Sequence, residues 1–142
     1  MASTQEGTIT MIRPEHLIQT LHLFSPSLPI GAFAFSQGLE AAIESRRVHD
    51  AESLRWYCDG VMRFSLTTLD CHYAIRAYRA DSESVFREVN TELLASRETR
   101  ELLQEDLLLG AALKRWATDQ DVDVPEAEEY SLVCLYGWIS AR

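Results

Sequence analysis

One short charged run, RETRE over residues 97–101, has the residue types and spacing that best support specific chemistry in this sequence. In a helix, Arg97 and Glu101 are four positions apart and can form an ion pair. Glu98 and Arg100 then project elsewhere and remain available to charged groups of another molecule. The chemistry is therefore recognition through ion pairs. The simpler alternative is a solvated charged helix face, whose pairs each contribute about 0.2–0.5 kcal/mol.

Catalytic and metal-binding motifs are absent from the sequence. It has no GxxxxGKS/T phosphate loop, no GxSxG nucleophile motif, no HExxH zinc motif and no CxxC pair. His16 and His22 are six positions apart on a predicted helix and lie on different faces, and the adjacent Cys71 and His72 point about 100° apart. Neither pair can easily share a metal ion. Because the catalytic motifs are absent as well, we expect no catalytic residue, no metal site and no cofactor in this chain.

The stretch SPSLPIGAFAFSQGLE, over residues 25–40, is neither a plain helix nor a plain loop. Pro26 and Pro29 fix their own φ at about −65° and favour extended conformations at the residues before them, and Gly31 can adopt conformations closed to other residues. Two phenylalanines follow, and then Ser36, which suits a helix N-cap. The stretch predicts a rigid, apolar connector that presents the start of a helix. An ordinary helix linker with buried aromatic rings is the alternative.

Helical periodicity predicts an all-α fold, a single-domain bundle of about seven helices in which the connector joins the first two. The SLTT stretch at residues 65–68 is rich in β-branched and hydroxyl side chains, which predicts a break or kink. No strand-like alternation of useful length is present. The expected helices cover about residues 14–24, 37–46, 50–65, 69–80, 81–95, 97–116 and 126–139.

Composition favours an ordinary globular protein of the cytoplasm. The chain has 142 residues, 46% of them hydrophobic, which suits one domain over residues 13–142 preceded by a flexible arm over residues 1–12. Its formal charge of −9 disfavours a nucleic-acid partner. The widely spaced Cys58, Cys71 and Cys134 indicate a reducing compartment. No signal peptide and no apolar run of membrane-spanning length is recognised.

The connector resembles the N-terminal signature of the UreF family of urease accessory proteins. A second block, SRETREL at residues 96–102, is similar to another signature of that family, at a suitable distance downstream. A third and weaker likeness is LYGWI at residues 135–139, which is similar to a Tyr-Ser-Trp stretch in a later family helix. The resemblance covers about residues 14–142, strongly in the two short blocks and loosely between them.

The resemblance implies an all-α protein without catalytic activity that forms a dimer. Family members dock on UreD, called UreH in some organisms, and the pair recruits the GTPase UreG to activate apo-urease, so nickel and GTP belong to the partner proteins. The positions implied for partner binding are Ser36, Glu40, Arg97, Glu98, Arg100 and Glu101. Those implied to shape the connector are Ser25, Pro26, Pro29, Gly31, Phe33, Gly38 and Leu39.

The sequence departs from the family pattern in two places. It ends soon after the LYGWI stretch, and the interval around residues 118–124 is shorter than in relatives by about one helix. The chain is therefore a fragment joined across a gap or a reduced version of the fold. The apolar ring of the last helix would then lack its usual neighbours, which predicts dimerisation or poor solubility.

Two other classes of function stay open on residue chemistry alone. One is a non-catalytic, acidic helical adaptor that binds a different protein partner. The other is an enzyme with Glu40 or Glu98 as its acid or base, which is disfavoured because no nucleophile, metal cluster or convergent histidine accompanies either residue.

Overall fold

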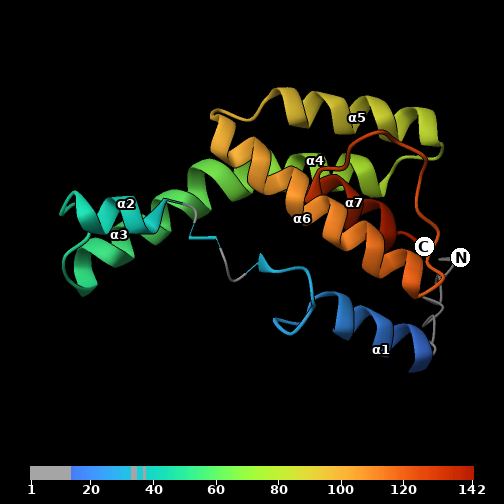
Figure 1. Ribbon diagram of the computed structural model, residues 1–142, viewed down its shortest axis with the longest axis horizontal. Helices are drawn as coiled ribbons and strands as arrows, with labels where there is room; N and C mark the ends of the chain where they lie inside the picture. Colours follow the sequence, from blue (N-terminus) through green and yellow to red (C-terminus); the bar gives the residue numbers. More distant parts are fainter. Residues whose placement is uncertain (1–13, 33–34, 37) are drawn as a thin grey trace, which may run out of the picture.

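The computed structural model describes residues 14–32, 35–36 and 38–142 of the protein. Within these ranges the chain forms helices and no strand (Figure 1), which confirms the all-α prediction. The predicted arm over residues 1–12 and Phe33 of the connector lie outside the described residues. No described helix has both the length and the apolar character that a membrane span requires. In chain order the elements are α1 (Pro14–Leu23), α2 (Leu39–Glu44), α3 (Ala51–Val61), the π-helix η2 (Met62–Asp70), α4 (Cys71–Tyr78), α5 (Glu83–Ala95), α6 (Arg100–Asp119) and α7 (Leu132–Ser140).

The hydrophobic core lies where α4, α5, α6 and α7 pack together, and α7 contacts each of the other three. Phe86 and Leu93 of α5, Leu113 of α6 and Leu135 of α7 are fully buried. Their side chains follow the helical spacing of the sequence, so one face of each helix turns inward. Burial of these faces is the main source of stability.

The last helix is covered on most of its surface. Cys134, Leu135, Trp138 and Ile139 are all buried, and the Trp138 ring meets the Phe86 ring edge to face with centroids 5.2 Å apart. The prediction that this helix would lack neighbours is therefore wrong, because α4, α5 and α6 supply them.

Two glycines allow close approaches inside the core. A Cβ added to Gly137 of α7 would overlap the carbonyl oxygen of Ala74 in α4. A Cβ added to Gly110 of α6 would overlap the carbonyl oxygen of Tyr130, just before α7. Only a residue without a side chain lets the backbones pack at this distance.

A continuous helical segment runs through α3, η2 and α4, over residues 51–78. The predicted break or kink in its SLTT stretch takes a milder form: the α-helix is interrupted there, but the chain stays helical and widens into π turns. The Thr68 hydroxyl donates to the carbonyl oxygen of Phe64 at 2.7 Å, and the Cys71 N–H bonds to Leu66, five residues back. A hydroxyl that takes the carbonyl four residues back competes with the α-helical ladder, which favours the wider turn.

Helices α2 and α3 form an arm that stands away from the core (Figure 1). No residue of α3 is buried, although its apolar residues recur at helical spacing. The predicted single bundle is therefore only partly formed. Helix α3 starts with a capping box between Asp50 and Ser53, in which the Ser53 N–H bonds to Asp50 Oδ1 at 2.8 Å.

The start of α2 differs from the prediction. The helix begins at Leu39, and its N-cap is Gly38, which has a φ of 83° and provides no side-chain hydrogen bond. The Leu39 N–H donates to the carbonyl oxygen of Ser36 at 3.0 Å. The predicted N-cap at Ser36 is therefore wrong, because a glycine in the left-handed conformation separates the serine from the helix.

Candidate partner-binding surface

The charged run at residues 97–101 straddles the start of α6. The prediction that Arg97 begins this helix is wrong, because Thr99 is the N-cap and its hydroxyl accepts the Leu102 N–H at 3.2 Å. Arg97 therefore lies in the turn between α5 and α6. The expected helical ion pair between Arg97 and Glu101 is not formed, and Arg97 pairs with other residues.

The Arg97 guanidinium bridges two carboxylates from different elements. Its Nη1 donates to Asp70 of η2 at 2.8 Å, and its Nε and Nη2 donate to Asp106 Oδ2 of α6 at 2.9 and 2.7 Å. The side chains of Arg97, Asp70 and Asp106 are 10%, 15% and 5% exposed. Burial alone would lower the pKa of Arg97, but the two carboxylates outweigh it and raise that pKa.

Asp106 also fixes the start of α7. Its Oδ1 accepts the Leu132 N–H at 2.8 Å and the Ser131 hydroxyl at 3.2 Å. Asn90 of α5 accepts the Ser131 N–H at 2.8 Å and donates to the carbonyl of Glu129 at 2.9 Å. The helix predicted from residue 126 begins instead at Leu132, because these side chains hold the preceding backbone in a non-helical path.

Sequence reasoning missed this buried polar cluster of Asp70, Arg97 and Asp106. One signal was present: Asp106 lies three, four and seven positions before Leu109, Gly110 and Leu113, which are all buried. A carboxylate on the buried stripe of a helix requires a partner, because an unpaired buried charge is costly.

The other charged residues of the run are exposed. Within the described residues Glu98, Arg100 and Glu101 form no ion pair; the sequence predicted this for Glu98 and Arg100, but it expected Glu101 to pair with Arg97. Glu40 is also exposed but lies on α2 in the arm, apart from the start of α6 (Figure 1). The structure therefore keeps residues 98–101 together and places Glu40 elsewhere.

The connector makes a tight turn at its proline-containing half. The Leu28 N–H donates to the carbonyl of Ser25 at 3.0 Å, and the Ile30 N–H donates to that of Leu28 at 2.8 Å. Leu28 and Ile30 are buried, and Gly31 has a φ of 79°. The leucine and isoleucine thus anchor the turn, and the glycine supplies a conformation that other residues rarely adopt.

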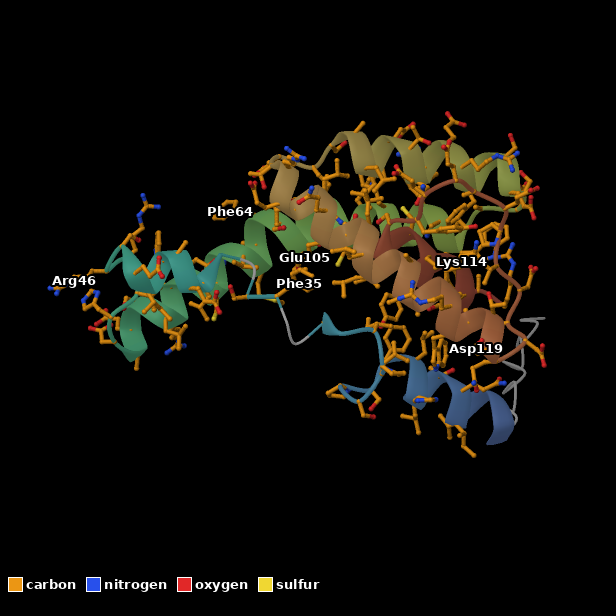
Figure 2. The ribbon with its side chains drawn as sticks, viewed as in Figure 1. Phe35, Arg46, Phe64, Glu105, Lys114 and Asp119 are labelled. Atoms are coloured by element: carbon orange, nitrogen blue, oxygen red, sulfur yellow. The ribbon has the colours of Figure 1, made fainter. Side chains whose placement is uncertain are left out.

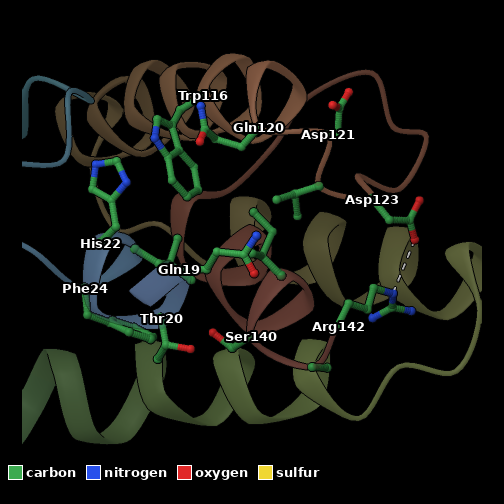
Figure 3. Close-up of a pocket in the computed structure, with 14 residues that line it drawn as sticks. Gln19, Thr20, His22, Phe24, Trp116, Gln120, Asp121, Asp123, Ser140 and Arg142 are labelled. Atoms are coloured by element: carbon green, nitrogen blue, oxygen red, sulfur yellow. Dashed lines mark ion pairs between the residues drawn. The ribbon is translucent and has the colours of Figure 1, made fainter. Parts of the chain in front are cut away.

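A cavity of about 430 Å³ separates the end of α1 from the ends of α6 and α7 (Figure 3). His22 of α1 meets Trp116 of α6 edge to face at 5.4 Å between centroids. Arg142 pairs with Asp123 at 3.5 Å at the opposite end. The lining of the cavity mixes aromatic and charged side chains, and the cavity lies where α1 packs against the core.

A groove on another face contains Glu98. Two adjoining hollows, of about 590 and 320 Å³, lie between the α3–η2 segment and the start of α6. Phe64 projects from η2 beside them (Figure 2). We call this feature the η2–α6 groove; it places an acidic residue of the charged run next to exposed aromatic rings.

The sequence matches the family model described as UreF over residues 48–142. It is 43% identical over 102 residues to a urease accessory protein UreF of Teredinibacter turnerae, covering 70% of this chain and 46% of that protein. It is 38% identical over 120 residues to a urease accessory protein UreF of Hahella chejuensis, covering 82% of this chain and 53% of that protein. A bifunctional urease accessory protein UreEF of Bordetella bronchiseptica is 45% identical over 107 residues, covering 72% of this chain and 24% of that protein. No solved structure matches the chain.

The chain spans about half the length of the curated relatives that it matches, with 46%, 53% and 57% of three of them covered. The region matched by the family model includes the charged run at residues 97–101 and the groove beside it. The connector precedes that region.

Proposed function

The chain belongs to the UreF family, and on this premise we propose that it acts as a urease accessory protein, a non-catalytic co-chaperone in urease maturation. In this role it supports assembly of the nickel metallocentre, while its partners handle nickel and GTP. The observation that carries the proposal is the family match over residues 48–142, together with relatives named as urease accessory proteins.

The proposed partners are UreD, called UreH in some organisms, the GTPase UreG and apo-urease, in the cytoplasm. A homodimer of this chain is the expected state in that complex, with residues 13–142 acting as one unit. The UreEF relative supports a place in urease maturation, because it is named as a bifunctional accessory protein of the same process.

The proposed contact surface is the start of α6. Glu98, Arg100 and Glu101 are exposed there and unpaired within the described chain, so they can form charge-assisted hydrogen bonds with a partner. Arg97 contributes by holding this turn against η2 and α6. Ser36 and Glu40 form a second proposed contact, at the connector and α2.

Urease activation in cells tests the proposal. Cells that carry urease and its other accessory proteins, including UreD and UreG, but no UreF should gain nickel-dependent urease activity when this chain is expressed. Glu98→Gln with Arg100→Gln should reduce that activity, whereas the matched control Arg115→Gln with Glu128→Gln, two exposed residues elsewhere, should not. Both pairs leave the net charge unchanged.

The outcomes test the proposed function and the proposed contact surface independently. Activity at the level of cells without the chain, although the chain is soluble and abundant, would contradict the proposed function. Activation by the original chain and by both variants alike would keep the function and reject the start of α6 as the contact.

A further inference from the structure

The η2–α6 groove is a continuous surface feature. Its two hollows share part of their lining, so they form neighbouring sections of one depression. Along the α3–η2 side it reaches from Trp56 to Leu69. At no more than about 1.5 Å per residue, since the π-helical part rises less, this is under 20 Å, or about three turns of an α-helix. The residues that line both hollows are Val61, Ser65, Arg97, Glu98 and Leu102.

Large apolar side chains lie open to solvent along this groove. Trp56 and Phe64 are 76% and 80% exposed, and Leu102 on the opposite wall is also exposed. All three line the same hollow. Exposed aromatic side chains gathered beside a depression are typical of protein interfaces, where tryptophan in particular contributes strongly to binding.

Two carboxylates flank the apolar strip. Glu98 lines both hollows and Glu105 lines the smaller one, and neither forms an ion pair within the described ranges. Arg97, the cation beside them, is bound to Asp70 and Asp106. Burial, aided by the charge of Asp106, raises the pKa of Glu105, so a cation brought by a ligand would relieve an unfavourable environment.

We propose that the η2–α6 groove binds a basic amphipathic helix of a partner protein. Its apolar side chains pack on Trp56, Phe64 and Leu102, and its arginines or lysines pair with Glu98 and Glu105. The groove length suits about 12–14 residues of helix, with anchors spaced three and four positions apart. The inference rests on the proposed partner-binding role and adds the chemistry of the partner.

A second copy of this chain fits the groove poorly. Helix α1 has exposed Leu17, Ile18 and Leu21, but its sequence PEHLIQTLHL contains no lysine or arginine to meet the two glutamates. A basic helix satisfies both the apolar strip and the carboxylates.

Peptide binding to the full chain tests the charge requirement. The probe is a labelled peptide of about 14 residues with leucines at helical spacing and arginines beside them, and its control replaces each arginine with glutamine. The arginine peptide should bind at least about tenfold more tightly, a difference of about 1.4 kcal/mol. Glu98→Gln with Glu105→Gln should remove most of that preference, whereas Glu126→Gln with Glu128→Gln, which changes the net charge equally, should not.

Removal of the aromatic rings of Trp56 and Phe64 tests whether the peptide binds in the groove. Trp56→Ala with Phe64→Ala should abolish binding of both peptides, while Leu108→Ala, at an exposed position of α6 that does not line the groove, should leave it intact. All variants should keep the original melting temperature within a few degrees, since the changed side chains are at least partly exposed.

Three results would overturn the inference. The chain could bind the arginine and glutamine peptides with equal affinity, or the groove variants and the control variants could lose peptide affinity equally. The original chain could also form a dimer that dissociates when Trp56 and Phe64 are replaced by alanine. The last would assign the groove to a second copy. Failure of the chain to activate urease would affect the proposed function alone, because peptide binding requires no urease component.

Discussion

Replacement of Arg97 by alanine is expected to destabilise the whole fold, although the sequence suggests a surface residue. The guanidinium joins η2 to α6 through Asp70 and Asp106, at 2.8 and 2.7 Å. Alanine would leave two carboxylates near each other without the cation between them. Asp106 would keep its bonds from Leu132 and Ser131, so it would remain held in the interior.

The expected loss is about 3 kcal/mol of unfolding free energy. Removal of one partner from a buried ion pair typically costs about 3–5 kcal/mol, and the partial exposure of Asp70 favours the lower end. Unfolding entropy of about 2.1 cal/mol/K per residue gives about 0.3 kcal/mol/K for this chain, so the melting temperature should fall by about 10 °C.

Thermal and urea melts followed by far-UV circular dichroism measure this loss. Arg100→Ala is the matched control, because Arg100 is an exposed arginine of the same run, and it should change stability by no more than about 0.5 kcal/mol. Arg97→Lys should lie between the two, because one ammonium cannot reproduce the forked contacts. An Arg97→Ala protein that melts within about 2 °C of the original would refute the buried ion-pair interpretation.

The remaining predictions concern glycine packing, backbone strain and a buried thiol. Gly137→Ala should cost about 1–3 kcal/mol because its Cβ would overlap the Ala74 carbonyl, whereas Gly60→Ala, with open space around it, should be neutral or stabilising in urea melts. Gly31→Val should cost about 1–2 kcal/mol through its positive φ alone, and an unchanged urea midpoint would count against that strain. Burial raises the pKa of Cys134 from 9.0 to about 12, so a thiol reagent should label only the other two cysteines in the folded protein. The Cys134 thiol ionises at lower pH in the unfolded chain than in the folded one. The stability that this thiol contributes should therefore be complete below pH 9.0 and be lost as the pH approaches about 12. Cys134→Ala should make the loss of stability at alkaline pH smaller.

Local signals in the sequence predicted the parts of the fold that local interactions decide. Asp50 stands just before an apolar run of helical spacing, and its side chain caps α3 by accepting the Ser53 N–H. Ser82 stands in the same position before α5, and its hydroxyl accepts the Val85 N–H. Phe86 follows the apolar spacing of α5 and is fully buried. Caps and apolar periodicity act within a few residues, so they can be recognised without the fold.

Long-range contacts decided the parts that were mispredicted. The start of α7 depends on Asn90 and Asp106, which lie far from residues 129–132 in the chain. Spacing to Glu101 predicts a helical ion pair for Arg97, and the family resemblance implies a role in partner binding, but two buried carboxylates from other elements engage it instead. Its proposed role in partner binding is therefore indirect, through the position of the turn.

The arm shows a different limit of sequence reasoning. Apolar residues recur along α3 at helical spacing, which favours a buried stripe, yet no residue of that helix is buried. Periodicity identifies a face that favours burial but does not say which molecule covers it. The exposed Trp56 is consistent with a covering partner, as the peptide experiment proposes.

Co-elution with UreD tests the proposed place in urease maturation most directly. Size-exclusion chromatography with light scattering would be run on this chain alone, on UreD alone and on their mixture. We predict a single species whose mass contains both proteins. Separate elution at micromolar concentrations, with a folded and soluble chain, would contradict the proposal that this UreF-family chain assembles with UreD.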